Sequence, residues 1–412
     1  MMDIPFTTSG LNRRTAQISL SATIAMSERA AQLRRDGRDV ISLSLGELDF
    51  ATPPRIVDAA HAAALAGETR YTAADGGPRI KDAVRQKLQR DNGLDFPPAN
   101  IHVASGCKQV IYNALAATLE SGDEVVMFAP YWVSYSEMVE FCGGRPVIVP
   151  TSAAAGFMPD PQALAAALTP RTRWVFLNSP NNPTGAVYSS GLLAELARII
   201  LAHSKALILS DEIYEHLVYD GRHVSTANAA PATLPRLLIV NGVSKAYAMT
   251  GWRIGFGAGP HWLIEGMAKV QSQTAGSSNS LAQAAAAEAL AGDQGVLPAW
   301  RDLLRQRRDR MAKLLAATDR LRAVPGGGAF YIFADVSRAI GAVTPTGKKI
   351  ESDSDLAEYL LDAANVATVP GAAFGASPYL RFSFALVEKR LDAACRRIVA
   401  ACNDLTTDRT RT

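Results

Sequence analysis

The chain has 412 residues, of which 48% are hydrophobic and 20% are charged, and its 42 basic and 39 acidic residues give a formal net charge of +3. This near balance gives no reason to expect binding to nucleic acid or to an anionic membrane surface. The chain is longer than one hydrophobic core usually supports, so we expect two domains.

The four cysteines show neither CxxC spacing nor a cluster typical of metal ligands, so no metal site is expected: Cys107, Cys142, Cys395 and Cys402. This usage suits a reducing compartment. Cys395 and Cys402 share a helical pattern, and we expect both in the core. Residues 1–10 lack a basic region followed by an apolar stretch, and no run of about 18 apolar residues could cross a bilayer. We therefore expect neither signal peptide nor membrane span, and a cytoplasmic location by default.

Between about residues 51 and 290, short apolar runs alternate with helical patterns such as Pro161–Leu168 and Ser190–His203. This alternation predicts a mostly parallel sheet covered by helices on both faces, forming a large domain of residues 51–290. Ligands of such sheets bind at the carboxyl ends of the strands. The runs that we interpret as buried strands are Glu124–Phe128, Pro146–Val149, Trp174–Leu177, Ala206–Leu209 and Leu237–Val240.

The remaining chain predicts a smaller α+β domain of residues 11–50 and 291–405, followed by a polar tail, 406–412, that we expect to be frayed. Leu297–Thr318 has an arginine-rich helical pattern typical of a solvated connecting helix. Further elements are the strands Ala329–Ala334, Val366–Val369 and Tyr379–Phe384 and the helices Ser354–Ala363 and Val387–Cys402.

A glycine turn follows the short predicted strand Ile101–Ala104. Gly106, Cys107 and Lys108 lie there, immediately before the predicted helix Gln109–Leu119. The free N–H groups of a helix start bind anions, and glycine lets the anion approach the backbone. An ordinary strand–helix connection would look the same.

Two further strand ends carry polar side chains. Asn182 lies in a rigid turn with two prolines and two more asparagines, where its amide either caps the backbone or contacts a ligand. Asp211 follows a buried strand, where a carboxylate is costly unless paired, although it would also suit a helix N-cap. A protonated pyridine nitrogen of a bound cofactor is a suitable partner for Asp211. Tyr214, on the same side of an expected helical turn, would reach a phenolic oxygen on the same ring.

Lys245 follows the apolar run Leu237–Val240, and Arg253 comes eight residues later. A lysine held against apolar surroundings loses its proton more readily and forms a Schiff base with an aldehyde. An arginine nearby pairs with a phosphate. Together they suit pyridoxal phosphate (PLP), although a surface turn would carry the same two residue types.

Several stretches resemble class I aminotransferases of PLP fold type I, specifically the prokaryotic aspartate aminotransferase subgroup. The resemblance runs from about Leu11 to Cys402, and the NPTG and SKAYAMTGWR motifs are highly specific. It implies a large domain with a mostly parallel seven-stranded sheet between helices, a smaller α+β domain, and a homodimer. The matching stretches are Ile41–Phe50, Arg70–Thr72, Pro130–Tyr135, Asn178–Tyr188, Ser210–His216, Asn241–Gly255 and Gly328–Tyr331.

The resemblance also implies roles for individual residues. Lys245 would bind PLP and move the proton, Asp211 would pair with the ring nitrogen, and Trp132 would stack on the ring. Arg381 would clamp the substrate α-carboxylate, with Gly46 near the same group. The remaining implied cofactor contacts are Asn182 and Tyr214 at the 3′-oxygen, Gly106, Cys107, Lys108 and Arg253 at the phosphate, and Tyr71 at the phosphate of the neighbouring subunit. Asn182 would also contact the substrate.

The chain departs from this family's pattern near the expected side-chain pocket. Relatives commonly have proline in place of Leu48, glycine in place of Cys107, and a basic residue where Ser19 and Leu20 stand. Phe384 lies in a stretch that relatives commonly read RISYATS. Losing a charged contact should weaken selectivity for dicarboxylic substrates, so we expect a substrate that is less polar or differently charged than aspartate. We place specificity around Ser19, Leu48 and Phe384.

The leading hypothesis is a transaminase that exchanges an amino group between an L-amino acid and a 2-oxo acid by ping-pong chemistry. A β-lyase or an amino acid oxidase on the same scaffold would use the same cofactor residues. A PLP-dependent transcriptional regulator is not expected, because only about ten residues precede the region of resemblance. An inactive binding protein is disfavoured because Lys245, Asp211, Asn182, Tyr214 and Arg381 are all present.

Overall fold

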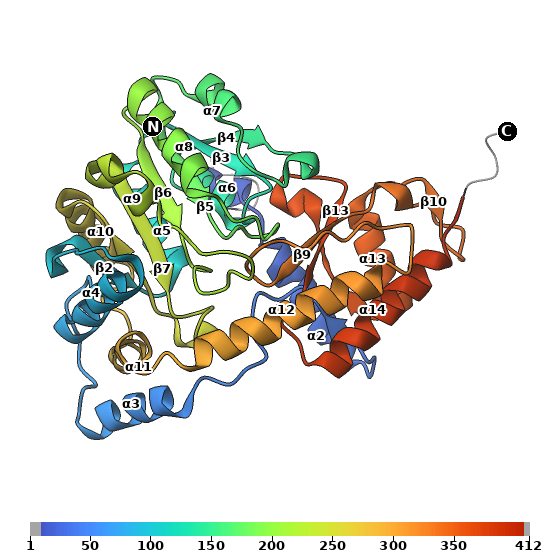
Figure 1. The fold of residues 1–412 in the computed structure, drawn as a ribbon, viewed down its shortest axis with the longest axis horizontal. Helices are drawn as coiled ribbons and strands as arrows, with labels where there is room; N and C mark the ends of the chain where they lie inside the picture. Colours follow the sequence, from blue (N-terminus) through green and yellow to red (C-terminus); the bar gives the residue numbers. More distant parts are fainter. Residues whose placement is uncertain (1–9, 408–412) are drawn as a thin grey trace.

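The computed structural model describes residues 10–407. The expectation of no signal peptide therefore falls almost entirely on residues outside the described part, as does the tail from residue 408. No helix among the described residues is long and apolar enough to cross a membrane. Figure 1 shows a large sheet flanked by helices at one end of the molecule, and a smaller sheet with α13 (Asp353–Ala364) and α14 (Glu388–Asn403) at the other.

The large sheet has seven strands in the order β2-β8-β7-β6-β5-β3-β4. β8 runs antiparallel to both neighbours, whereas the pairs from β7 to β4 are parallel. The predicted mostly parallel sheet is confirmed, but β8 was missed because its GFGA sequence lacks β-branched residues. The strands are β2 (Ile101–Ala104), β3 (Glu124–Ala129), β4 (Arg145–Pro150), β5 (Thr172–Asn178), β6 (Leu207–Asp211), β7 (Leu237–Gly242) and β8 (Gly255–Ala258).

The two faces of this sheet bury alternate residues of the same strands. Val125 and Met127 of β3 pack in one core cluster, and Val126 and Phe128 pack in another. This follows from the two-residue period of a strand, and it explains why the central strands are apolar throughout. The edge strand β4 differs from the prediction of a buried strand, because only Val149 in it is buried.

Helices cover both faces of the sheet. α5 (Cys107–Thr118) and α10 (His261–Thr274) pack on the face of Val125, while α4 (Pro78–Asn92) and α8 (Ser190–His203) pack on the face of Val126. Other helices of this part are α3 (Pro54–Leu65), α6 (Ser134–Phe141), α7 (Pro161–Ala167) and α11 (Ser280–Ala291).

The smaller sheet has three antiparallel strands in the order β12-β13-β9. They are β12 (Val369–Pro370), β13 (Tyr379–Ser383) and β9 (Tyr331–Asp335). The amino-terminal segment joins this part, because β1 (Ile41–Ser42) pairs with β11 (Val366–Ala367) and α2 (Ala22–Arg35) contacts both. Cys395 and Cys402 of α14 are buried in the same core, as predicted.

α12 (Val296–Leu315) exposes Arg305 and Arg310, as expected for a solvated connecting helix, but two of its other arginines are not solvated. Arg307 binds Asp49 through both guanidinium nitrogens, at 2.7 and 2.9 Å, and Arg308 binds Asp220 at 2.7 Å. Both arginines are buried. Paired guanidinium groups and their aliphatic stems tolerate burial, so this face of α12 ties the amino-terminal segment to the loop after β6.

The predicted frayed tail also needs correction at its beginning. Thr406–Thr407 forms β14, which pairs antiparallel with β10 (Ala342–Val343). Backbone hydrogen bonds to another strand hold these two polar residues, and side-chain polarity alone does not reveal such pairing.

Candidate active site

A cavity of about 490 Å³ lies where the carboxyl ends of β5 and β6 meet the segments that follow β2 and β7. The register places Asn178 opposite Asp211, so the two strands end together. Among the predicted site residues, the cavity is lined by Gly46, Cys107, Lys108, Trp132, Asn182, Asp211, Tyr214, Lys245, Arg253 and Arg381. Gly106 does not line the cavity but lies against the guanidinium of Arg253, which does. Tyr71 lines a different surface pocket.

Lys245 comes three residues after β7 and faces this cavity. Its Nζ donates a 2.6 Å hydrogen bond to the Gly46 carbonyl and lies 6.0 Å from the centre of the Phe330 ring. Burial lowers the pKa of Lys245 to about 8. Near neutral pH, the unprotonated amine that a nucleophile requires is therefore far more populated than in an ordinary lysine.

Asp211 ends β6 and is buried, with no basic side chain in residues 10–407 paired to it. Burial raises the pKa of Asp211 to about 6. Tyr135 donates a 2.6 Å hydrogen bond to Oδ2, and the Ile213 backbone N–H donates a 3.2 Å bond to Oδ1. A cation placed in the cavity beside this carboxylate would offset the cost of burying it.

The segment after Asp211 is a turn and not the helix that we expected. Asp211 is therefore no helix N-cap, although its Oδ1 does accept the Ile213 N–H as in an Asx turn. Tyr214 still faces the cavity, where its hydroxyl hydrogen-bonds the Tyr331 hydroxyl at 3.0 Å.

The predicted anion site would lie at the start of α5, where Gly106 and Arg253 meet. Gly106 has a φ of +90°, and a Cβ there would come 2.4 Å from Arg253 Nη2. Arg253 donates hydrogen bonds of 3.1 Å to the Ser105 and Thr250 carbonyls, which hold its guanidinium beside the helix start. Positive charge and free N–H groups thus converge as a phosphate requires.

Arg381 of β13 is a buried cation that forms no ion pair with a carboxylate in residues 10–407. It is 2% exposed, its Nη1 donates to Asn182 Oδ1 at 2.9 Å, and its Nη2 donates to the Ser44 carbonyl at 2.5 Å. Its Nε has no hydrogen-bond partner among the described residues, and its guanidinium lies 4.3 Å from the centre of the Tyr331 ring. Burying a guanidinium among neutral groups is costly unless a carboxylate joins it.

Trp132 and Lys108 meet on another side of the cavity. Lys108 Nζ lies 5.1 Å from the centre of the Trp132 ring, and no carboxylate in residues 10–407 pairs with this ammonium group. Cys107 donates its Sγ–H to the Asn241 carbonyl at 3.1 Å, and burial raises the pKa of its thiol well above the usual range. The thiol is thus unreactive, and its backbone lies at the anion site.

Three residues that we expected to shape specificity do not line the cavity. The Ser19 N–H donates to Glu137 Oε2 at 2.9 Å, Phe384 is fully buried in the core of the smaller part, and Leu48 packs against that core. These residues lie within a few positions of cavity residues in the sequence, but position along the chain does not reveal in which direction a side chain packs.

Tyr135 and Tyr331 are site residues that the sequence analysis missed, although both lie in stretches that match the family. Tyr331 lines the cavity, and a Cβ on Gly46 would come 2.5 Å from its hydroxyl, which explains the need for glycine there. Other lining residues without a predicted role are Ser21, Thr23, Ile24, Leu45, Glu47, Ser134, Asn178, Ile213, Ser244, Thr250 and Gly251.

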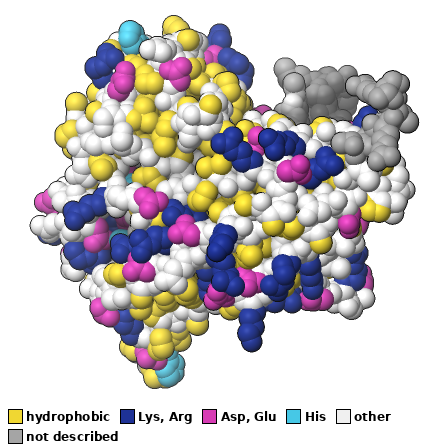
Figure 2. Space-filling view, turned by 45° about the vertical axis from the view of Figure 1, so that its right-hand side comes forward, with side chains coloured by type: hydrophobic (Ala, Val, Ile, Leu, Met, Phe, Trp, Pro, Cys, Tyr) yellow, Lys and Arg dark blue, Asp and Glu magenta, His cyan; other side chains and the backbone are white. Residues whose placement is uncertain are grey.

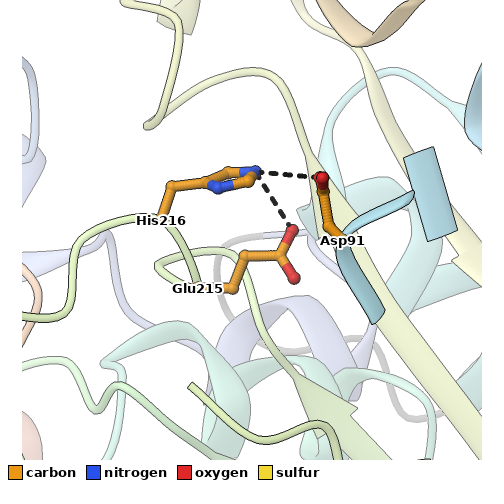
Figure 3. A group of neighbouring side chains, drawn as sticks. All are labelled: Asp91, Glu215 and His216. Carbon is orange, nitrogen blue, oxygen red and sulfur yellow. Dashed lines mark ion pairs between the residues drawn. The ribbon is translucent and has the colours of Figure 1, made fainter. Parts of the chain in front are cut away.

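A cluster of charged side chains lies at the turn that follows Asp211. His216 Nε2 is 3.6 Å from Asp91 Oδ2 and 3.4 Å from Glu215 Oε1 (Figure 3). The three side chains are spaced closely enough for a metal ion, but the Lys87 ammonium contacts Glu215 and hydrogen-bonds Asn92 Oδ1 at 2.7 Å. A lysine thus supplies the cation of this cluster.

A family model described as aminotransferase class I and II matches residues 38–398. The chain belongs to this family. It is 47% identical over 393 residues to an aspartate aminotransferase of Rhizobium meliloti, covering 95% of this chain and 96% of the relative. It is 46% identical to an aspartate/prephenate aminotransferase of Cereibacter sphaeroides, covering 96% of this chain and 99% of the relative.

Solved structures of aminotransferases share the fold. The aspartate aminotransferase structure from Rhizobium meliloti superposes with a TM-score of 0.92 at 47% identity, covering 96% of this chain and 99% of that one. That from Thermus thermophilus with maleate gives 0.88 at 42% identity, covering 95% and 99%. The chain is therefore a PLP-dependent aminotransferase of fold type I, which moves an amino group between an amino acid and a 2-oxo acid.

Proposed function

We propose that Lys245 would hold PLP by condensing its amine with the cofactor's aldehyde, with release of water, and that the same amine, once the substrate's amine has displaced it, would accept the proton from the substrate Cα and return it to the cofactor's C4′ carbon. When bound, PLP supplies a ring that withdraws electrons from the substrate Cα. The lowered pKa of Lys245 supports both roles, because the amine must be neutral to attack and to accept a proton.

Other cavity residues fit the remaining groups of PLP. Asp211 is a buried carboxylate that forms no ion pair within the described part of the chain, and it suits a protonated ring nitrogen. Trp132 offers a ring face, and Asn182 and Tyr214 carry polar groups suited to the 3′-oxygen. The phosphate would bind the anion site formed by the backbone at Gly106, Cys107 and Lys108 and by the guanidinium of Arg253.

The observation that carries the proposed reaction is the buried, anion-free guanidinium of Arg381 in the same cavity as Lys245. A substrate α-carboxylate there would supply the missing anion through a bidentate pair. The Arg381–Asn182 hydrogen bond links this carboxylate site to the cofactor site, and Gly46 leaves room between them.

We further propose that the substrate is a dicarboxylic amino acid such as aspartate, contrary to our expectation from the sequence. Ser19 lies outside the cavity, so the missing basic residue there does not remove a charge from it. Lys108 lines the cavity with an unpaired ammonium group that suits a distal carboxylate. Relatives at 46–47% identity are named aspartate and aspartate/prephenate aminotransferases, and the Thermus thermophilus structure was obtained with maleate, a dicarboxylate.

We also propose a cytoplasmic homodimer that serves amino acid biosynthesis. Tyr71 is 97% exposed and Leu65 79% exposed, which favours a partner on this surface. Tyr71 would reach the partner's phosphate site. The unpaired cysteines fit a reducing compartment. We retain the division into a large domain, 51–290, a small domain, 11–50 and 291–405, and a tail, because the two sheets follow it.

A Lys245→Ala variant tests the proposed function. It should lose the visible absorbance of covalently bound PLP, and borohydride should no longer fix the cofactor to the protein. In the wild type, aspartate in a single half-reaction should convert the bound cofactor to its amine form. Persistent covalent PLP in the variant would contradict the assignment of Lys245. Ammonia release or oxygen uptake without that conversion would favour a β-lyase or an oxidase.

A further inference from the structure

Tyr135 contacts two residues of the cavity, Asp211 and Trp132. It lies on α6, is 1% exposed, and donates its hydroxyl to Asp211 Oδ2 at 2.6 Å. That length is typical of a hydrogen bond from a hydroxyl to an ionised carboxylate. Burial, and next the negative charge of Asp211, raise the pKa of Tyr135 well above its usual range. The phenol therefore stays protonated and remains a donor at every working pH.

The ring of Tyr135 is held from two sides. It packs edge-on against Phe176 of β5, at 5.2 Å between ring centres, and against Trp132, at 5.4 Å. These contacts leave the hydroxyl little freedom to turn away from Asp211. The same side chain thus connects Trp132, a residue of the cavity wall, to the carboxylate.

Asp211 depends on this bond because little else opposes the cost of burying its charge. Burial raises its pKa, and the hydrogen bond from Tyr135 is the largest effect in the other direction, followed by that from the Ile213 N–H. No basic side chain among the described residues forms an ion pair with it.

We propose that Tyr135 is a positioning residue that keeps Asp211 ionised and oriented toward the cofactor's ring nitrogen. This inference rests on the proposed role of Asp211. Without the phenol, the carboxylate is less stable, so the proton shared with the ring nitrogen shifts toward Asp211 and the ring becomes a weaker electron acceptor.

Tyr135→Phe tests the proposal, because it removes the hydroxyl and keeps the ring. We expect the dissociation constant of PLP to rise by about 10- to 100-fold, as for loss of one hydrogen bond to a charged group. With ring-¹⁵N-labelled PLP, the nitrogen resonance should move toward that of neutral pyridine. Tyr188→Phe is the matched control, because Tyr188 is also buried and its hydroxyl has no hydrogen-bond partner in the described residues. It should leave both measurements unchanged.

A double-mutant cycle with Asp211→Asn separates the proposed role of Tyr135 from the proposed role of Asp211. If Tyr135 acts through Asp211, adding Tyr135→Phe to Asp211→Asn should change PLP binding by less than about twofold. An additive effect would mean that the Tyr135 hydroxyl acts independently of Asp211 and would overturn the proposal, as would a Tyr135→Phe protein with wild-type binding and resonance. If Asp211→Asn itself has no effect, the assigned role of Asp211 fails instead. Thermal unfolding verifies that each variant is folded.

Discussion

Lys245 and Asp211 face one cavity, and burial changes the pKa of each in the direction that favours the neutral form. It lowers the pKa of Lys245 to about 8 and raises that of Asp211 to about 6. The amine thereby becomes a nucleophile, whereas the carboxylate needs Tyr135 and a cation to stay charged. Arg381 cannot lose its charge at working pH, so its burial selects for an anionic substrate group.

Lys108→Met tests the proposed contact to a distal carboxylate. The variant keeps much of the side chain's volume and loses its charge, so we expect kcat/KM for aspartate to fall by about 10- to 100-fold and that for phenylalanine to change little. Steady-state kinetics with both donors measures this, and Lys269→Met, at an exposed site on α10, is the control.

A different result would support the role that the sequence predicted for Lys108, which is to bind the cofactor phosphate. Weaker PLP binding with equal losses for both donors would mean that Lys108 serves the phosphate. A wild type that prefers phenylalanine to aspartate would contradict the proposed substrate class.

At the scale of elements, one buried carboxylate ties three strands together at the edge opposite the cavity. Glu124 begins β3 and accepts hydrogen bonds from Arg145 of β4, at 2.6 Å, and from Arg171 just before β5, at 2.9 Å. Thr169 donates to its other oxygen at 2.7 Å. This cluster holds the amino ends of the three strands together.

The pH dependence of this cluster is testable. Burial alone would raise the pKa of Glu124, but hydrogen bonds from Thr169, Arg145 and Arg171 outweigh it and lower the pKa to about 2. The unfolded chain takes up the proton near pH 4.5, so the stabilisation is complete above that pH and is lost as pH falls toward 2.

Glu124→Gln should therefore lower the free energy of unfolding by about 2 kcal/mol at pH 7 and by progressively less between about pH 4.5 and 2. Urea denaturation across this range measures the difference. Glu265→Gln, which breaks an exposed pair with Lys269, should cost much less. A difference that stays constant with pH would show that Glu124 does not act through its charge.

At the scale of the whole molecule, neither sheet contains the site alone. Lys245 and Asp211 come from the large sheet, Arg381 comes from the smaller one, and Gly46 lies in the amino-terminal segment. The Arg307–Asp49 pair fastens that segment to α12. Figure 2 shows basic and acidic side chains interspersed on one face of the molecule, in keeping with the near-neutral net charge.

The proposed dimer predicts complementation between two defective variants. Tyr71→Ala should lower PLP affinity because the partner's phosphate loses a contact, and Lys245→Ala should be inactive. Unfolding and refolding the two together should restore activity to about one quarter of the wild-type sites, since half of the dimers are mixed and each has one intact site. A monomer in sedimentation, or no recovery after mixing, would contradict the shared site.

The sequence alone determined the strand–helix alternation, the polar strand ends and most of the predicted residues that line the cavity. These features have short periods or lie in contiguous motifs, so local spacing encodes them. Only the tertiary structure decided that Tyr135 bonds Asp211, 76 residues away, that Arg381 meets Asn182, and that Lys108 rather than Ser19 lines the cavity. Such contacts depend on packing between elements that are remote in the chain, and a side chain's burial and hydrogen-bond partners exist only once those elements have packed.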